Sequence, residues 1–392
     1  MTRARTLAWA MMRMLLGVAL TAGVFYWVIY REHYYHAPHS ARTAAGDALF
    51  QKGGTVAVVW PDGDCCGFIH GVRMAWEETS HSGPLAGKVK LREFHEGAGH
   101  HSEAATSAAS DPSVLAVLGH ESSESAVAAS LTYESSGLLF MTPMATEPRL
   151  TAYGFRYLFR LTPSDREITA SLAQLAKANG WTRLGVVYAR NEHGESFAPH
   201  FVAQAEEAGL KVTFMRSYLP HADQDYRQDF RPLIAGFSDD PYDAVVIADR
   251  LPRAGWLLRD LRSMGVTAPI LGGDKLDSPL LWRTAGQAAN GVYVASAVDP
   301  ESEVPEAVRF RREFERRFGR PPDYEATQGY EAYRLLAAAW EASRSGAPLV
   351  VATTLRTRPW KGLFGRYSFT ADGDIGGRAI SIKRMKNGAF DH

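Results

Sequence analysis

Short apolar runs and amphipathic stretches alternate along most of the chain. The runs at residues 55–60 (TVAVVW) and 184–188 (LGVVY) are short and uncharged, as buried strands are. Segments such as 66–79 and 324–343 instead repeat their apolar residues at helical spacing. Strands that alternate with helices are typical of a parallel, doubly wound sheet, and the series starts again after residue 161. The pattern therefore predicts an α/β protein with two similar lobes.

A longer uncharged apolar run, residues 14–30, stands near the start of the chain and follows three arginines. Its 17 residues are about the shortest helix that spans a bilayer, and they are many for the core of a signal peptide. Because arginines favour the cytoplasmic side, we predict a cytoplasmic tail (1–13), an uncleaved transmembrane anchor and a working part on the periplasmic side of the inner membrane. A cleaved signal is the alternative. The polar stretch 31–51 has no sustained period and is predicted to be a tether.

Composition and motifs exclude several classes of function. Lysine plus arginine (43) equal aspartate plus glutamate (43), which indicates no basic surface for nucleic acid. The chain has no G-x-S-x-G nucleophile elbow, no C-x-x-C pair, no P-loop and no G-x-G-x-x-G after a strand. His193, Glu195 and Ser196 are close in sequence, but neighbours within one turn seldom form a catalytic relay. We therefore predict that the protein is not an enzyme, needs no cofactor and binds no nucleic acid.

A group of cysteines and histidines makes metal binding an alternative function. The group contains Cys65, Cys66, His70, His95, His100 and His101, near the ends of the first two predicted strands. Thiolates and imidazoles are ligands for zinc or copper(I). However, adjacent cysteines rarely bind one ion together, and HEGAGH separates its histidines by five residues instead of the four of helical zinc sites. We therefore predict no metal site.

One stretch, residues 118–150, carries the clearest candidate for a binding site. It reads LGHESSESAVAASLTYESSGLLFMTPMATEPRL: a strand end, a serine-rich turn that opens a helix, a second strand and a second turn. Strand ends of a parallel sheet meet at one edge, and the start of a helix attracts anions. Ser122, Ser123 and Thr146 are therefore candidates to hold a carboxylate. The alternative is that a serine only caps the helix and the second turn only redirects the chain.

The pattern GHESSES…GLLFMTPMATEPRLT resembles the core signature of the type I periplasmic binding proteins that serve branched-chain amino acid and amide ABC importers. The likeness extends in the same order from about residue 55 to about residue 384. It implies two doubly wound lobes with three crossings between them, near Leu161, Ala297 and Gly376. The implied limits are residues 52–163 and 298–376 for lobe 1, and residues 164–297 and 377–392 for lobe 2.

The resemblance also implies how a ligand is held. By matching motifs, Ser123 and Thr146 would bind the α-carboxylate of an amino acid, and the carbonyl of Met144 with the acid Asp274 would hold its ammonium group. A zwitterion needs such partners for both charges, because burying either charge unpaired is costly. We therefore expect these residues to meet across a cleft between the lobes.

Three residues make the expected cleft more polar than one built for leucine or valine. His193, the expected lid residue, stands where the family often has a tyrosine, and Arg250 where it has another aromatic residue; Asp64 follows the first strand. The expected ligand is therefore a polar or acidic amino acid, an amide or another carboxylate. The alternative for each of the three is an exposed residue at the rim.

Together these observations predict an exported binding protein that captures an amino-acid-like or small carboxylate ligand for an ABC permease. Two rival functions stay open at this point. The same lobes would serve a membrane signalling partner as a ligand-sensing module, or Cys65, Cys66 and the nearby histidines would bind a metal.

Overall fold

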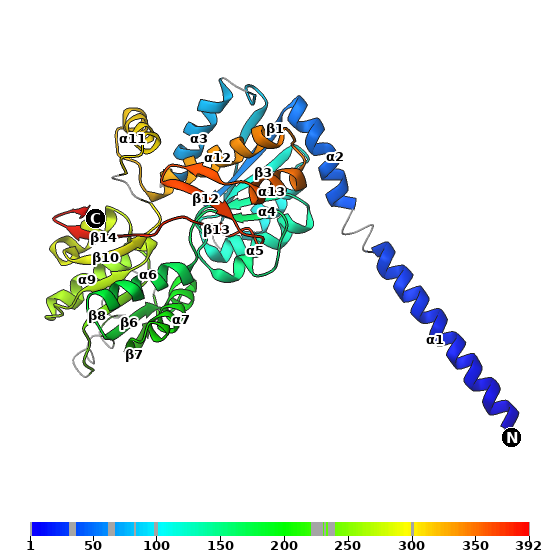
Figure 1. Ribbon diagram of the computed structural model, residues 1–392, viewed down its shortest axis with the longest axis horizontal. Coiled ribbons are helices and arrows are strands. Elements are labelled where there is room, and N and C mark those ends of the chain that lie inside the picture. Colours follow the sequence, from blue (N-terminus) through cyan, green and yellow to red (C-terminus); the bar gives the residue numbers. More distant parts are fainter. Residues whose placement is uncertain are drawn as a thin grey trace.

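The computed structural model describes residues 2–30, 37–61, 67–81, 84–97, 101–220, 230, 233, 240–298 and 302–391. The strands of this part form three sheets, of five, seven and three strands. We call the part built on the five-stranded sheet lobe 1 and the part built on the seven-stranded sheet lobe 2. Figure 1 shows them beside each other.

Lobe 1 is a parallel sheet with helices on both faces. Its strand order is β2-β1-β3-β4-β5, with β1 (Gly54–Pro61), β2 (Val89–Glu96), β3 (Val114–Gly119), β4 (Leu139–Thr142) and β5 (Leu158–Arg160). Its helices are α3 (Gly67–Ser80), α4 (His101–Ser110), α5 (Ser123–Ser135), the 3-10 turn η2 (Pro148–Thr151), α11 (Pro305–Phe318), α12 (Tyr324–Ser343) and α13 (Pro348–Thr357). Alternate residues of β1 enter two different cores: Val56 and Val58 pack with α3 and α12, whereas Ala57 and Val59 pack with α4 and α5.

Helices α3 and α12 pack closely because glycine stands at both contact points. A Cβ atom on Gly71 would lie 1.9 Å from the carbonyl oxygen of Ala326, and one on Gly329 would lie 2.3 Å from that of Phe68. No side chain fits into either contact, so these glycines set the distance between the two helices. The contact fixes the start of α12, which borders the candidate site described below.

Lobe 2 repeats this architecture with a larger sheet. Its strand order is β15-β14-β10-β9-β8-β6-β7, with β6 (Arg183–Ala189), β7 (Lys211–Tyr218), β8 (Ala244–Ala248), β9 (Ile270–Gly272), β10 (Val292–Ser296), β14 (Ser381–Lys386) and β15 (Ala389–Asp391). Helices α6 (Asp165–Ala178) and α7 (Glu192–Glu207) contribute to the core on one face. Helices α9 (Arg253–Ser263) and α10 (Leu280–Ala285) contribute to the other. The 3-10 turns η3 (Asp274–Leu276) and η4 (Gly286–Ala289) complete the lobe.

The chain passes from one large sheet to the other three times: after β5, after β10, and after the small antiparallel sheet of β11 (Trp360–Gly362), β12 (Gly365–Phe369) and β13 (Ile375–Gly376). The prediction of an α/β protein with parallel sheets is confirmed. Within the two large sheets, among the described residues, only β14 and β15 depart from it, because they pair antiparallel.

Most of the polar stretch predicted to be a tether is helical and contacts lobe 1. Helix α2 (Ala37–Lys52) lies against lobe 1, where Arg42 donates to the carbonyl oxygens of Val114 and Ala109 at 2.8 and 2.6 Å. Asp47 accepts hydrogen bonds from the hydroxyl of Ser345 and from the N–H of Gly346 on the same lobe. The sequence shows no apolar period here because polar contacts hold this helix in place, and alanine-rich segments form helices readily.

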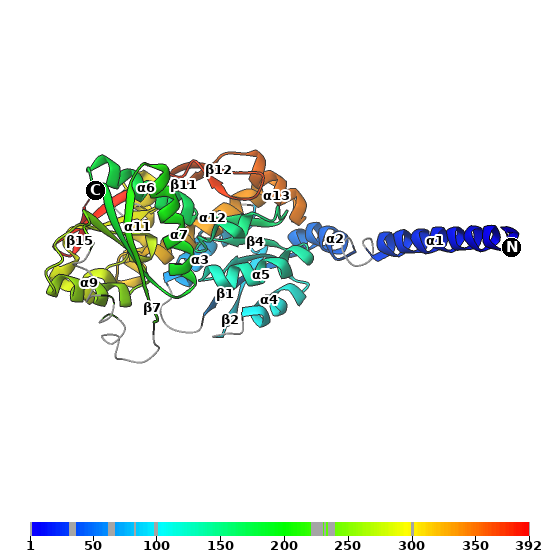
Figure 2. The ribbon, with the colours of Figure 1, turned by 90° about the horizontal axis from the view of Figure 1, so that it is seen from below.

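The first helix, α1 (Thr2–Tyr30), extends away from both lobes (Figures 1 and 2). Within the described residues, no helix combines the length and the apolarity that crossing a bilayer requires. The transmembrane anchor predicted over residues 14–30 is therefore not supported, and its 17 residues were already about the shortest possible span.

Candidate functional site

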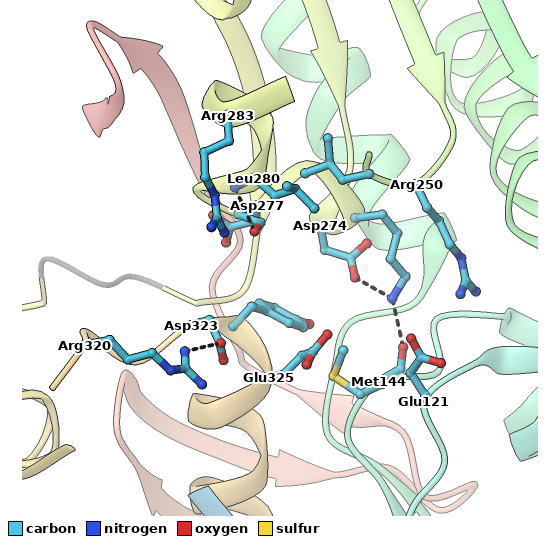
Figure 3. Close-up of a pocket in the computed structure, with 14 residues that line it drawn as sticks. Glu121, Met144, Arg250, Asp274, Asp277, Leu280, Arg283, Arg320, Asp323 and Glu325 are labelled. Carbon is cyan, nitrogen blue, oxygen red and sulfur yellow. Dashed lines mark hydrogen bonds and ion pairs between the residues drawn. The ribbon is translucent and has the colours of Figure 1, made fainter. Parts of the chain in front are cut away.

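A cavity of about 500 Å³ lies between the two lobes. Residues that follow the carboxyl ends of four parallel strands reach it: Glu121 after β3, Met144 after β4, Arg250 after β8 and Asp274 after β9. The other lining residues are Leu251, Lys275, Asp277, Ser278, Leu280, Arg283, Arg320, Asp323, Tyr324 and Glu325 (Figure 3). Ligands of open α/β sheets are bound at this position, so the cavity is the candidate functional site.

Two serines of the serine-rich turn, Ser122 and Ser123, make different contacts. Ser122 caps α5, since its hydroxyl oxygen accepts the N–H of Ser125 at 3.1 Å. Ser123 is buried, and its hydroxyl oxygen accepts the N–H groups of Thr146 and Glu147 at 3.1 and 3.3 Å. The structure thus joins the two turns through Ser123 and Thr146. Neither residue lines the cavity, but both stand close in sequence to the lining residues Glu121 and Met144.

Three of the residues predicted for the site do line the cavity: Met144 from lobe 1, and Arg250 and Asp274 from lobe 2. Lys275, which the sequence analysis did not name as a ligand-binding residue, lies between them. Its ammonium group donates to the carbonyl oxygen of Met144 at 3.2 Å and lies 3.1 Å from Oδ2 of Asp274 (dashed lines in Figure 3). The acceptors expected for a ligand ammonium group are therefore both in contact with a lysine of the protein itself.

His193, the expected lid residue, is buried near the start of α7 and does not line the cavity. It packs on Phe197 with ring centres 5.3 Å apart. Burial, and then the positive charges of Arg250 and Lys275, lower the pKa of His193 well below its ordinary value. The imidazole is therefore neutral and contributes no charge to the site. Asp64, the remaining predicted residue, lies outside the described residues.

A buried carboxylate that does not line the cavity interacts electrostatically with the lining residue Asp274. Asp165, at the start of α6, accepts a hydrogen bond from the hydroxyl of Ser196 at 2.8 Å. Burial, and then the neighbouring charge of Asp274, raise the pKa of Asp165 to about 6. Two carboxylates thus share one poorly solvated region at the junction of the lobes.

The raised pKa of Asp165 predicts a measurable pH dependence of stability. Because the folded-state pKa of about 6 exceeds the ordinary value of 3.8, Asp165 favours folding fully below about pH 4, and this contribution is lost as the pH rises through 6. We compare the free energy of unfolding of Asp165→Asn with that of the wild type at each pH. This difference should be about 2–3 kcal/mol more favourable to the variant at pH 7.5 than at pH 4. Urea titrations of both proteins across this range measure the difference.

A matched variant distinguishes the effect of the raised pKa of Asp165 from the effect of removing any carboxylate. Arg183 holds the pKa of the partly exposed Asp243 down to about 2, so Asp243→Asn should change the stability profile only in acid. Parallel profiles for wild type and Asp165→Asn between pH 4 and 7.5 would contradict a raised pKa at Asp165.

Further charged groups complete the site, and the sequence had indicated none of them. Asp277 pairs with the fully buried Lys383 at 2.7 Å, and Asp323 pairs with Arg320 at 2.7 Å while capping α12. The pKa of Glu325 is raised to about 7 by burial and by the nearby charges of Asp323 and Glu121. The site is therefore polar, through the predicted Arg250 and through further charged residues that the prediction did not include. Lys383 and Asp277 are 106 positions apart, so no local motif marks this pair.

The histidines and cysteines of the alternative metal site are only partly described. Cys65, Cys66 and His100 lie outside the described residues. Among the remaining described side chains, no group of three or more His, Cys, Asp or Glu is arranged to hold a metal ion.

Sequence comparison relates the chain to known binding proteins. Residues 67–389 match the family model described as Periplasmic binding protein. The amino acid binding protein of Pseudomonas aeruginosa is 26% identical over 267 residues, which are 67% of this chain and 69% of the relative.

Solved structures have the same fold over nearly their whole length. The ABC transporter substrate-binding protein from Desulfitobacterium hafniense in complex with Leu is 28% identical, with a TM-score of 0.74 over 86% of this chain and 99% of that one. A leucine binding protein from Thermotoga maritima is 25% identical, with a TM-score of 0.77 over 86% of this chain and 97% of that one.

Proposed function

The chain belongs to the family of periplasmic binding proteins, and from this membership we propose that it captures a small amino-acid-like or carboxylate solute for an ABC importer. The observation that carries the proposal is the cavity of about 500 Å³ between the lobes. Its volume suits a small molecule, and its lining offers both cations and anions. Family members are binding proteins, in agreement with a role other than catalysis.

The proposed mechanism is closure of two lobes around the solute. We take lobe 1 as residues 52–163 and 298–376, and lobe 2 as residues 164–297 and 377–392, so that three connecting segments act as hinges. Closure would create the surface that a permease recognises. Both lobes supply lining residues, which favours a site that is complete only when they are together.

We propose that the ligand carboxylate is bound next to the joined turns of Ser123 and Thr146. Ser123 accepts two N–H groups, and no acceptor among the described residues binds its own hydroxyl proton, which we assign to the anion. Thr146 belongs to the same turn as the lining residue Met144. The relatives named above include proteins that bind amino acids, which are carboxylates, and this supports the assignment.

A thermal-shift screen of the full chain tests solute capture. Amino acids, amides and small carboxylates are added in turn, and at least one should raise the melting temperature; a ligand at one hundred times its dissociation constant adds about 2.7 kcal/mol. Absence of any shift across the panel would contradict the proposal.

Variants then locate the site. Thr146→Val should weaken binding of the best ligand by at least about tenfold, because one proposed donor is lost. Thr354→Val removes a hydroxyl from the exposed face of α13 and should leave binding unchanged. Cys65→Ser should also have no effect, whereas loss of binding in that variant would favour the metal alternative.

Attachment to the membrane is a separate hypothesis within this proposal. The family is periplasmic by name, which supports export, while anchorage by residues 14–30 is supported only by their uncharged apolar sequence. Cell fractionation distinguishes the two cases. Release of the protein with the soluble periplasmic contents would contradict anchorage and would leave solute capture untouched.

A further inference from the structure

Lys275 occupies a central position in the candidate site. It lies in the 3-10 turn η3 of lobe 2, and its side chain is only 12% exposed. The ammonium group reaches across the cavity to the carbonyl oxygen of Met144 in lobe 1, 3.2 Å away. It also contacts Oδ2 of Asp274 at 3.1 Å. One cation of the protein thus contacts both lobes.

Asp274 depends on this lysine for its counter-charge. Its side chain is 1% exposed, and neither carboxylate oxygen receives a hydrogen bond from the described residues. The contact with Lys275 is thus an ion pair without hydrogen-bond alignment. A buried carboxylate without any cation would be strongly unfavourable, particularly beside the buried Asp165. Lys275 is therefore a fixed part of the folded site, unlike an exposed lysine on the protein surface.

An ammonium group on a ligand would compete with Lys275. The Met144 carbonyl and the Asp274 carboxylate are already in contact with one ammonium, and a second beside it would be repelled. Displacing Lys275 would move its charge out of a contact that is nearly closed to water. A ligand that carries a carboxylate and no ammonium meets neither obstacle, and it finds Arg250, Arg283 and Arg320 along the same cavity.

Three acids on the lobe 1 side line the cavity and need not exclude such an anion; one of them, Asp323, is paired with Arg320 at 2.7 Å. The other two are Glu121 and Glu325. The pKa of Glu325 is raised to about 7 by burial and by its acidic neighbours, so this group is partly neutral near pH 7. A neutral carboxyl group donates a hydrogen bond to an anion instead of repelling it.

We propose that Lys275 is a resident cation in the place of a ligand ammonium group, so that the site prefers small carboxylates without an amino group over the corresponding amino acids. This inference rests on the proposed capture of a solute, and it names the class of that solute.

The test compares matched pairs of ligands on the full chain by isothermal titration calorimetry. The pairs are leucine with 4-methylpentanoate, phenylalanine with 3-phenylpropanoate, aspartate with succinate, and glutamate with glutarate. Within the pair that binds best, the compound without the amino group should bind at least about tenfold more tightly. Equal or tighter binding of the amino acid overturns the inference, as does binding of uncharged amides alone; in both cases solute capture stands. If none of these compounds binds and no amide of the thermal-shift panel binds either, solute capture fails and the inference fails with it.

A lysine variant tests the cause of the preference. Lys275→Met removes the resident cation and frees Asp274 and the Met144 carbonyl, so the preference should reverse by at least about tenfold towards the amino acid. Lys386→Met, at an exposed lysine of the same lobe, is the control and should keep the wild-type preference. An unchanged preference in a folded Lys275→Met protein overturns the role of Lys275. Should this variant not fold, the comparison of ligand pairs on wild type decides alone.

Discussion

Replacing Arg378 with alanine is expected to lower the free energy of unfolding by about 3–5 kcal/mol and to loosen the connection between the lobes. Arg378 lies between β13 and β14, in the third segment that passes from lobe 1 to lobe 2. Its guanidinium donates to the carbonyl oxygen of Leu161 at 2.9 Å and to that of Ala297 at 3.3 Å. These two carbonyls belong to the first and second passing segments, so one side chain holds all three together.

The expected loss of stability is large because the substitution leaves buried polar groups without their partner. Arg378 is nearly buried and is anchored to lobe 1 through Glu331, whose Oε2 lies 2.7 Å away, and through the side-chain oxygen of Gln328 at 3.1 Å. Without the guanidinium, the carboxylate of Glu331 stays buried without its cation, and two carbonyls lose a donor. Removal of one partner of a buried pair costs more than the intact pair contributes.

Chemical unfolding measures the stability loss, and small-angle scattering with and without a bound ligand measures the lobe arrangement. Arg384→Ala, at an exposed arginine of β14, is the matched control and should cost less than about 1 kcal/mol. Arg378→Lys retains the charge but lacks the planar fork, so we expect an intermediate loss. If Arg378→Ala costs no more than the control, Arg378 does not hold the segments together.

The elements of the fold could be predicted from the sequence because each reflects a local pattern. The segment predicted as a helix over residues 324–343 is helix α12 (Tyr324–Ser343), and the buried run 184–188 lies within strand β6. Strand β6 is buried on both faces and therefore reads as a short continuous apolar run, whereas α12 repeats its large apolar side chains at helical spacing. Helix α2 shows no such pattern, since polar contacts and not an apolar face hold it on lobe 1.

The site could be predicted only in part, because its decisive contacts join distant residues. Lys275 and Met144 are 131 positions apart, and Arg378 and Leu161 are 217 apart. No spacing rule connects such pairs, and a lysine or arginine in an unfamiliar segment is most often exposed. The resemblance to a family drew attention to Met144 and Asp274 through their motifs. It gave no indication that the residue after Asp274 fills the space between them.

The second large effect is expected at Arg160, at the end of β5 in lobe 1. Its guanidinium is fully buried and forms a fork with Asp374, with Nε 2.6 Å from one carboxylate oxygen and Nη2 2.7 Å from the other. A third hydrogen bond reaches the carbonyl oxygen of Glu147 at 2.7 Å. Glu147 follows Thr146 directly, so Arg160 ties the turn of the proposed carboxylate site to the small sheet beside lobe 1.

Arg160→Ala is therefore expected to destabilise the protein by about 3–5 kcal/mol, since it leaves an acid and a carbonyl without their shared donor. Arg149→Ala is a stringent control because Arg149 also pairs with Glu147, at 2.9 Å, but is 74% exposed; its loss should cost less than about 1 kcal/mol. Equilibrium unfolding in guanidinium chloride compares the two variants, and calorimetry with the best ligand shows whether the turn of Thr146 is disturbed. Equal losses for the buried and the exposed arginine would contradict the assignment. A large loss for Arg160→Ala with weakened binding would show that the strand end and the carboxylate turn form one structural unit.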